Sequence, residues 1–280
     1  MQVNDSRALV GTVSAASAAV AADKQEGAQS CSSGFAPAPA PAERVTLGAL
    51  HFKEANEQVR QALDRVDDVA LEDVRAQRYL GCALPAGKRL RIHGTPGNDL
   101  ACFMDGGTVE VLGNAQDQVG NTMNAGEVIV HGRCGDAAGY AMRGGRVFIR
   151  DGCGWRAGIH MKAYDARQPV VVVGKDAGSF LGEYMAGGVF VVLGETGDYL
   201  ARGMHGGVIY LKNPPRAGAL SDEVVLSRID DADLAVLAPL LAEYDRLFAS
   251  ELGYRVSAEA PEFFRVTPAS SRPYASMYVR

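Results

Sequence analysis

The chain has 280 residues, 47% of them hydrophobic and 22% charged, and its formal net charge is −5. This charge argues against a nucleic-acid-binding or anionic-membrane-binding protein, and no apolar run is long enough to span a bilayer. Glycine is abundant at 33 residues while aromatic residues make up only 7%, which is typical of a fold with many tight corners.

Residues 1–44 are a low-complexity segment of Ala, Ser, Gly and Pro that ends in Pro37-Ala-Pro39-Ala-Pro41. Such a segment buries too little apolar surface to offset its ordering entropy, so we predict a disordered tail. The Ala-rich stretch from Ala8 to Ala22 has an alternative interpretation as a secretory segment, but it contains little Leu and Arg7 is its only nearby base.

Residues 45–92 are predicted to form an N-terminal cap and a lead-in to the repeat that follows. One helical face of residues 53–66 is apolar, and a strand-like segment, Val69 to Val74, comes next. A solenoid needs its open ends covered, and this helix suits that role.

Residues 93–212 contain a repeat marked by six methionines: Met104, Met123, Met142, Met161, Met185 and Met204. From each methionine to the next the numbering rises by 19, except for a rise of 24 between Met161 and Met185, where residues 162–169 carry the extra length. Two apolar positions follow most of them, at Val109/Val111, Val128/Val130, Val147/Ile149, Phe190/Val192 and Ile209/Leu211. A fixed period of about 20 residues indicates a solenoid, in which the methionines stack as one internal column.

The repeat lacks the Leu and Asn pattern of leucine-rich repeats and has too many glycines for helical repeats. We therefore predict an all-β protein, a right-handed single-stranded parallel β-helix of about 19-residue coils with short flanking helices. Glycines are expected at the corners, where the backbone is left-handed.

Residues 213–280 are predicted to form a helical C-terminal cap and tail. After Pro214-Pro215, a helix is expected from about Asp233 to Phe248, with Asp231 as candidate N-cap. Pro239 should kink or split this helix.

The sequence predicts no catalytic, cofactor-binding or metal-ligating residue. Gly152-x-Gly154 belongs to the repeat and opens no helix, and the five histidines do not form a column. Five cysteines without a C-x-x-C pair fit a reducing compartment, so we expect a cytoplasmic protein. Cys134 and Cys153, one repeat period apart, are either a disulfide or two small buried hydrophobes.

A cluster of basic residues is the main candidate for function. Two explanations stay open, a solvated face or an interface with an acidic partner chain or anionic substrate. The cluster lies on two coils and on the expanded loop and comprises Arg143, Arg146, Arg150, Arg156, Lys162 and Arg167.

Several strings carry a family resemblance, among them Gly139-Tyr-Ala-Met142-Arg-Gly-Gly145 and Phe180-Leu-Gly-Glu-Tyr-Met185-Ala-Gly-Gly188. Together with Gly174-x-x-x-Gly178-x-x-x-Gly182, they resemble the glycine-repeat (GXGXG) C-terminal domain of the glutamate synthase large chain, in its stand-alone subunit form. The chain also resembles, more distantly, the glycine-repeat subunit of formylmethanofuran dehydrogenase and of the formyltransferase/hydrolase complex.

The first resemblance implies a non-catalytic scaffold subunit that binds no cofactor itself. Its implied partners are a glutaminase-type amidotransferase subunit and a glutamate synthase subunit with FMN and iron–sulfur clusters, which together move glutamine amide nitrogen to 2-oxoglutarate. The second resemblance implies a one-carbon formyl-transfer complex. A third alternative, a β-helix enzyme acting alone, would need paired acids on one column, and Glu110 and Glu127 are out of phase.

Overall fold

A computed structural model describes residues 40–256 and 263–270 of the chain. Most of the tail predicted for residues 1–44, and the final ten residues, lie outside the described part. The elements in chain order are β1 (Glu43–Thr46), α2 (Phe52–Arg65), β2 (Asp68–Arg75), β3 (Arg89–Thr95), β4 (Asp105–Val111), β5 (Ala125–Val130), β6 (Arg146–Ile149), β7 (Val170–Val173), β8 (Ala186–Val192), β9 (Gly206–Leu211), β10 (Val224–Arg228), α3 (Asp231–Leu252) and β11 (Phe264–Pro268).

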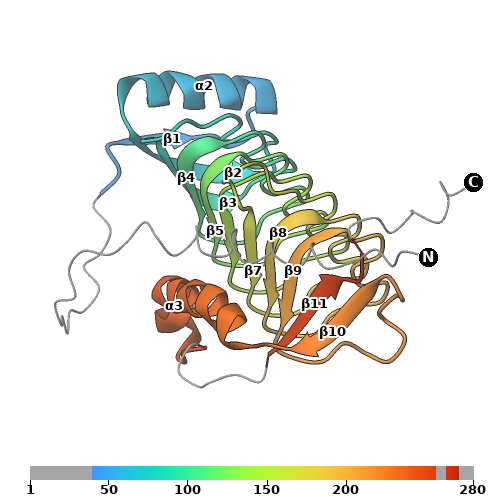
Figure 1. The fold of residues 1–280 in the computed structure, drawn as a ribbon. Coiled ribbons are helices and arrows are strands. Elements are labelled where there is room, and N and C mark those ends of the chain that lie inside the picture. Colours follow the sequence, from blue (N-terminus) through green and yellow to red (C-terminus); the bar gives the residue numbers. More distant parts are fainter. Residues whose placement is uncertain (1–39, 257–262, 271–280) are drawn as a thin grey trace, which may run out of the picture.

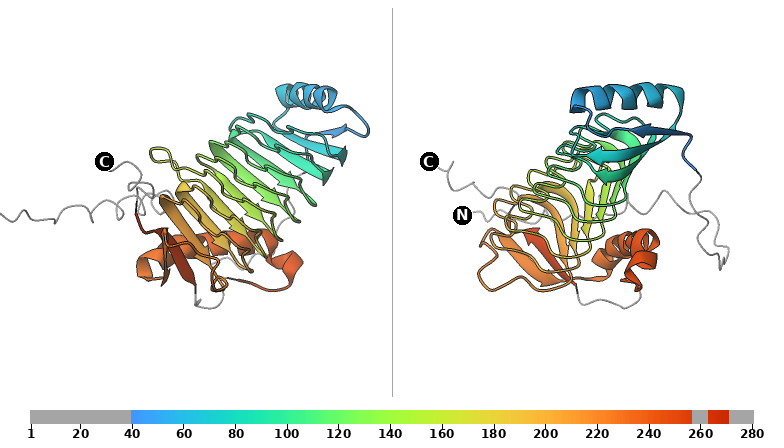
Figure 2. Two further views of the ribbon diagram at one scale, coloured as in Figure 1. Left: turned by 90° about the vertical axis from the view of Figure 1, so that its right-hand side faces the viewer. Right: turned by 180° about the vertical axis from the view of Figure 1, so that it is seen from behind.

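The predicted parallel β-helix is confirmed. Strands β1 to β9 are hydrogen-bonded in sequence order and every pair is parallel, so each coil adds one strand to a single sheet (Figure 1). Val128 on β5 pairs with Val109 on β4 and Val147 on β6. The longer interval between Met161 and Met185 keeps this register, because its extra residues form a loop that protrudes from the stack (Figure 2, left).

The six methionines form the predicted interior column, and each of them is fully buried. The two apolar positions of every strand point into the same core. Backbone hydrogen bonds between corresponding corners fix the coil spacing, as from the Gly139 N–H to the Val119 oxygen at 2.8 Å and from the Gly158 N–H to the Ala138 oxygen at 2.8 Å.

The expectation that glycines take the left-handed positions holds in part, since positive φ angles occur at glycines such as Gly126 and Gly145 but also at many other residues. Each complete corner uses three alternate left-handed residues, as at Arg156, Gly158 and His160. Only the middle one is mostly glycine, because its added Cβ would contact the interior; at Gly158 it would lie 2.9 Å from the Phe190 ring. The outer two point to solvent, and the hydrogen bonds between coils hold them in this less favourable conformation.

Helix α2 confirms the helix predicted at residues 53–66. Its apolar face buries Ala55, Val59 and Ala62 in the main core, at the end of the stack where β1 and β2 lie (Figure 1). The N-cap is His51, whose ring accepts a hydrogen bond from the Lys53 N–H. The helix therefore shields the first coil from solvent.

The C-terminal region is more elaborate than the predicted helical cap. β11 pairs antiparallel with β9, and β10 pairs antiparallel with β11, so two strands extend the sheet beyond the last coil. Helix α3 lies along the outer face of the sheet (Figures 1 and 2), on a second apolar cluster that includes Phe148, Val172, Val191 and Phe248. This cluster exists because the middle position of each strand, Glu110 on β4, becomes apolar from β5 onward.

Two details of α3 correct the expectations from sequence. The N-cap is Asp230 rather than Asp231, since the Asp230 carboxylate accepts hydrogen bonds from the Ala232 and Asp233 N–H groups and forms a capping box with Asp233. Pro239 does not split the helix, which runs continuously for 22 residues. Burial of Leu237, Leu240 and Leu241 around the proline offsets the single backbone hydrogen bond that it removes.

Candidate functional site

The structure brings two members of the predicted basic cluster together. Arg143 and Lys162 occupy the same position on adjacent coils, where their N–H groups bond to the Met123 and Met142 oxygens at 2.8 and 2.9 Å. Both side chains are exposed, and among the described residues neither forms an ion pair. We call this pair the basic column.

Of the remaining members, Arg167 lies beside the pair, since a Cβ on Gly144, the residue after Arg143, would be 3.2 Å from the Arg167 Cβ, and the others are dispersed. Arg146 begins β6 beside Glu127 of β5, and Arg150 binds Glu251 of α3 at 2.6 Å. Arg167 lies in the protruding loop, bridged to Tyr164. Arg156 lies on a different corner, so the cluster is not one patch.

A stack of aromatic side chains, not predicted from the sequence, lies on the corner that carries Arg156. The rings of Phe180 and Tyr199 are parallel within 17°, with centroids 4.7 Å apart, and Trp155 lies 6.3 Å from Phe180. The Arg156 guanidinium lies 5.0 Å above the Phe180 ring and binds Glu183 at 3.2 Å. The signal was present in the sequence, because Phe180 and Tyr199 are separated by exactly one period of the repeat.

A second stack lies a few residues further along the same coils. The rings of His160 and Tyr184 are stacked at 5.2 Å, and Tyr140 meets His160 edge-on at 6.2 Å. His160 is exposed and is separated from Lys162 of the basic column only by the buried Met161. We call the two stacks together the aromatic corner, which comprises Tyr140, Trp155, His160, Phe180, Tyr184 and Tyr199.

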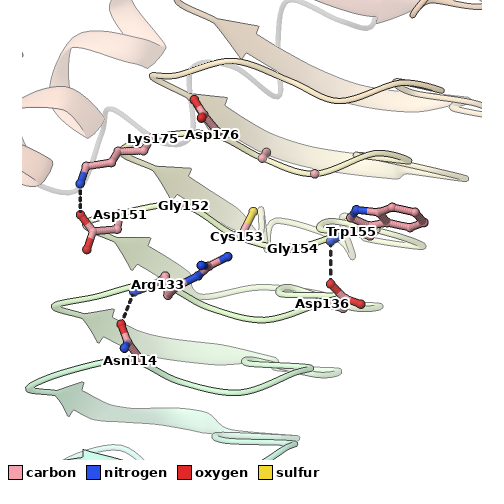
Figure 3. A pocket seen from close by; sticks show the side chains of 12 residues that line it. Asn114, Arg133, Asp136, Asp151, Gly152, Cys153, Gly154, Trp155, Lys175 and Asp176 are labelled. Atoms are coloured by element: carbon pink, nitrogen blue, oxygen red, sulfur yellow. Dashed lines mark hydrogen bonds and ion pairs between the residues drawn. The ribbon is translucent and has the colours of Figure 1, made fainter.

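A groove of about 640 Å³ runs across the coils next to Trp155 (Figure 3). Its polar side chains mainly hold the coils in register. Three side chains accept hydrogen bonds from backbone N–H groups: Asp136 from that of Trp155 at 2.8 Å, Asn114 from that of Arg133 at 3.0 Å, and Asp176 from that of Glu195 at 2.8 Å. Each bond joins residues one period apart, so these groups are structural.

The cysteine in this groove is not an activated nucleophile. Burial raises the pKa of the Cys153 thiol to about 12, and burial likewise raises the pKa of Cys134 well above its usual value. Both cysteines are buried free thiols. The small-hydrophobe alternative is therefore confirmed over the disulfide.

His131 joins the sheet to α3. Its Nδ1 lies 2.5 Å from Glu251 of the helix, and its Nε2 lies 3.3 Å from Glu110 of β4. Burial, the largest single influence, lowers the His131 pKa, but the two carboxylates together raise it above its usual value. One ring nitrogen contacts the helix and the other contacts the neighbouring strand, so the arrangement stabilises the fold.

Paired acids of the kind a glycosidase needs are not aligned at the two positions considered. Glu127 pairs with Thr108, and Glu110 pairs with Ile129, which confirms that the two are out of phase. Across residues 40–256 and 263–270, no group of three or more His, Cys, Asp or Glu has the arrangement of a metal site. In the same ranges, neither helix has the length and apolar character needed to cross a membrane.

Comparison with known proteins gives a match along most of the repeat and its flanks. A family model described as the GXGXG motif matches residues 53–269. An uncharacterized protein of Methanocaldococcus jannaschii is 39% identical over 252 residues, which is 84% of this chain and 97% of that protein.

Two further similarities are more limited. The glutamate synthase [NADH] of Schizosaccharomyces pombe is 34% identical over 94 residues, which is 31% of this chain but only 4% of that protein. Among solved structures, a chain of the formyltransferase/hydrolase complex of Methylorubrum extorquens, determined with methylofuran, has a TM-score of 0.57. It is 23% identical, and the match covers 77% of this chain and 89% of that one, a likeness of fold alone.

Proposed function

This chain belongs to the GXGXG-motif family, and we propose that it is a non-catalytic scaffold subunit of a multi-subunit, glutamate-synthase-like oxidoreductase. The supporting observation is the family match over residues 53–269, which spans strands β2 to β11, helix α3 and all but the first residue of helix α2. The local match to a glutamate synthase favours the same assignment.

The architecture suits a part that fixes distances. Backbone hydrogen bonds join every coil to the next, and the side chains of Asn114, Asp136 and Asp176 add bonds between residues one period apart. Such a stack resists bending more than a chain of loops does, because each coil is tied at its strand and at its corners. Proteins bound at two places on it would keep a constant separation.

Under this proposal, separate chains carry the chemistry. A glutaminase-type amidotransferase subunit would release ammonia from glutamine, and a second subunit with FMN and iron–sulfur clusters would use it to convert 2-oxoglutarate to glutamate. This chain would hold neither cofactor, and the complex would work in the cytoplasm.

A second candidate is the corresponding subunit of a formyltransferase/hydrolase-type complex in one-carbon metabolism. The observation that favours it is the fold likeness, which covers 89% of a chain from such a complex. That likeness reaches further along this chain than the glutamate synthase match, which covers 31% of it.

Purification of the tagged full-length chain from its native cells separates the candidates. The first predicts co-purified chains with flavin and iron–sulfur absorbance and glutamate formation from glutamine and 2-oxoglutarate with a reduced electron donor. The second predicts formyltransferase and hydrolase chains, formyl transfer and no flavin. Turnover by the isolated chain, or its purification without any partner, would contradict both scaffold roles.

A further inference from the structure

We propose that the aromatic corner, with the basic column beside it, is the docking surface for a partner protein that presents an apolar centre edged by carboxylates. The proposed surface is a binding face of the scaffold, and it rests on the proposed function only because both require that a protein partner exists.

The first support is exposure. Trp155 and Tyr199 are 57% and 53% exposed, and Trp155 lies at the opposite end of its coil from the helix (Figure 3). Other aromatic side chains are exposed as well, such as Phe103 and Tyr164, but at this corner the exposed rings belong to a contiguous stack, and exposed aromatic residues are enriched in protein interfaces. The two ends and the outer sheet face already have covers in α2, the β10–β11 pair and α3.

The second support is the stacking itself, which favours a protein over a nucleic acid or a sugar. Nucleobases and sugars bind on open ring faces. Here the faces of Phe180 are occupied by Tyr199 and by the Arg156 guanidinium, and His160 stacks on Tyr184. The accessible parts include the exposed rings of Trp155 and Tyr199, which pack well against aliphatic and aromatic side chains.

The third support is charge. Arg143, Lys162 and Arg202 are exposed and have no ion-pair partner within the described ranges. Of the carboxylates near the corner, Glu183 is bound to Arg156, and Asp136 accepts the Trp155 N–H. The carboxylates of Asp222 and Glu223 lie near Arg202 at the Tyr199 end of the corner, so the uncompensated cations are those of the basic column, and a complementary partner places its acidic residues against Arg143 and Lys162.

The surface is also preorganised. The backbone of Arg156, Phe180 and His160 is fixed by hydrogen bonds to the next coil, at 2.9, 2.8 and 3.0 Å. Rings that are already stacked lose little side-chain entropy when a partner covers them.

Photo-crosslinking tests the surface directly in the full-length chain within its native complex. Benzoylphenylalanine replaces Tyr199, or, as a matched control, Tyr254, which is 54% exposed just beyond α3. After irradiation, mass spectrometry identifies the linked peptide. We expect position 199 to link to a different protein at an apolar segment flanked by Asp or Glu, and position 254 not to link there.

Paired variants supply the energetics. We expect Trp155→Ala with Tyr199→Ala, and separately Arg143→Glu with Lys162→Glu, each to reduce retained partner about tenfold or more, with thermal unfolding little changed. Tyr254→Ala and Lys53→Glu, exposed residues outside the surface, serve as matched controls and should retain the partner. Retention should also fall as salt rises.

Several outcomes would overturn the inference: equal linkage from positions 199 and 254, linkage to nucleic acid or to a second copy of this chain, or unchanged retention in both paired variants. The two proposals fail separately. Linkage at 199 to an acidic protein in a complex without flavin would reject the glutamate-synthase role alone. A flavin complex linked only through 254 would reject the docking surface alone.

Discussion

Met142→Ala is expected to destabilise the solenoid strongly. Met142 is fully buried in the middle of the methionine column, and its sulfur packs 3.8 to 3.9 Å from where Cβ atoms on Gly139 and Gly120 would stand. The neighbouring coils cannot close the gap, because their spacing is fixed by backbone hydrogen bonds. The cost should thus lie in the middle or upper part of the usual range for Met→Ala, about 3 to 5 kcal/mol of unfolding free energy.

Urea unfolding measures this cost, since Trp155 is the only tryptophan and lies one coil away from Met142. Its fluorescence should report the coil that loses support, and circular dichroism should report the whole sheet. Met142→Leu is the matched control, because it keeps most of the volume and should cost less than about 1.5 kcal/mol. A loss below about 0.5 kcal/mol for the alanine variant, or equal losses for both, would refute close packing along the column.

Two further predictions concern the attachment of α3. A Cβ on Gly174 would lie 1.8 Å from the Tyr244 hydroxyl oxygen and 2.2 Å from the Arg150 carbonyl oxygen. Gly174→Ala should therefore break the 2.8 Å hydrogen bond between those two groups and raise the rate of amide hydrogen exchange across α3. An unchanged exchange rate would contradict this packing. Because the folded-state pKa of His131 is raised above 6.5, the stability from its ion pairs should be complete below that pH and fade as pH rises through the higher folded value. The stability gap between wild type and His131→Gln should therefore narrow as pH rises above about 6.5, and a constant gap would show that charged His131 does not hold the helix.

The period of the methionine repeat was sufficient to predict the strand register and the buried methionine column. Backbone geometry enforces both, since residues one coil apart must stack when strands are in register. The same rule applies to the aromatic corner, because Phe180 and Tyr199 are in phase. The corner as a whole was not predicted, since Trp155 and Tyr140 occupy other phases of the repeat than Phe180 and Tyr199.

Other features lay beyond the period. The side chains of Arg156, His160 and Phe180 give no sign of a left-handed backbone, which the hydrogen bonds of neighbouring coils impose. The position of α3 depends on the change from Glu110 to apolar residues at the middle of the later strands. That pattern can be interpreted only when it is known which face of the sheet is the outer one. The helix likewise continues through Pro239 because of the apolar contacts around it, which the sequence pattern did not reveal.

If this chain holds its partners in position and the partners carry the catalytic sites, neither should form glutamate without the other. The most direct measurement is glutamine-dependent glutamate formation in three samples. The first contains the separated partner chains alone, the second contains those chains together with this chain, and the third contains this chain alone. We predict activity only when chain and partners are combined. Full activity of the partners without it, or any turnover by the chain alone, would contradict the scaffold role.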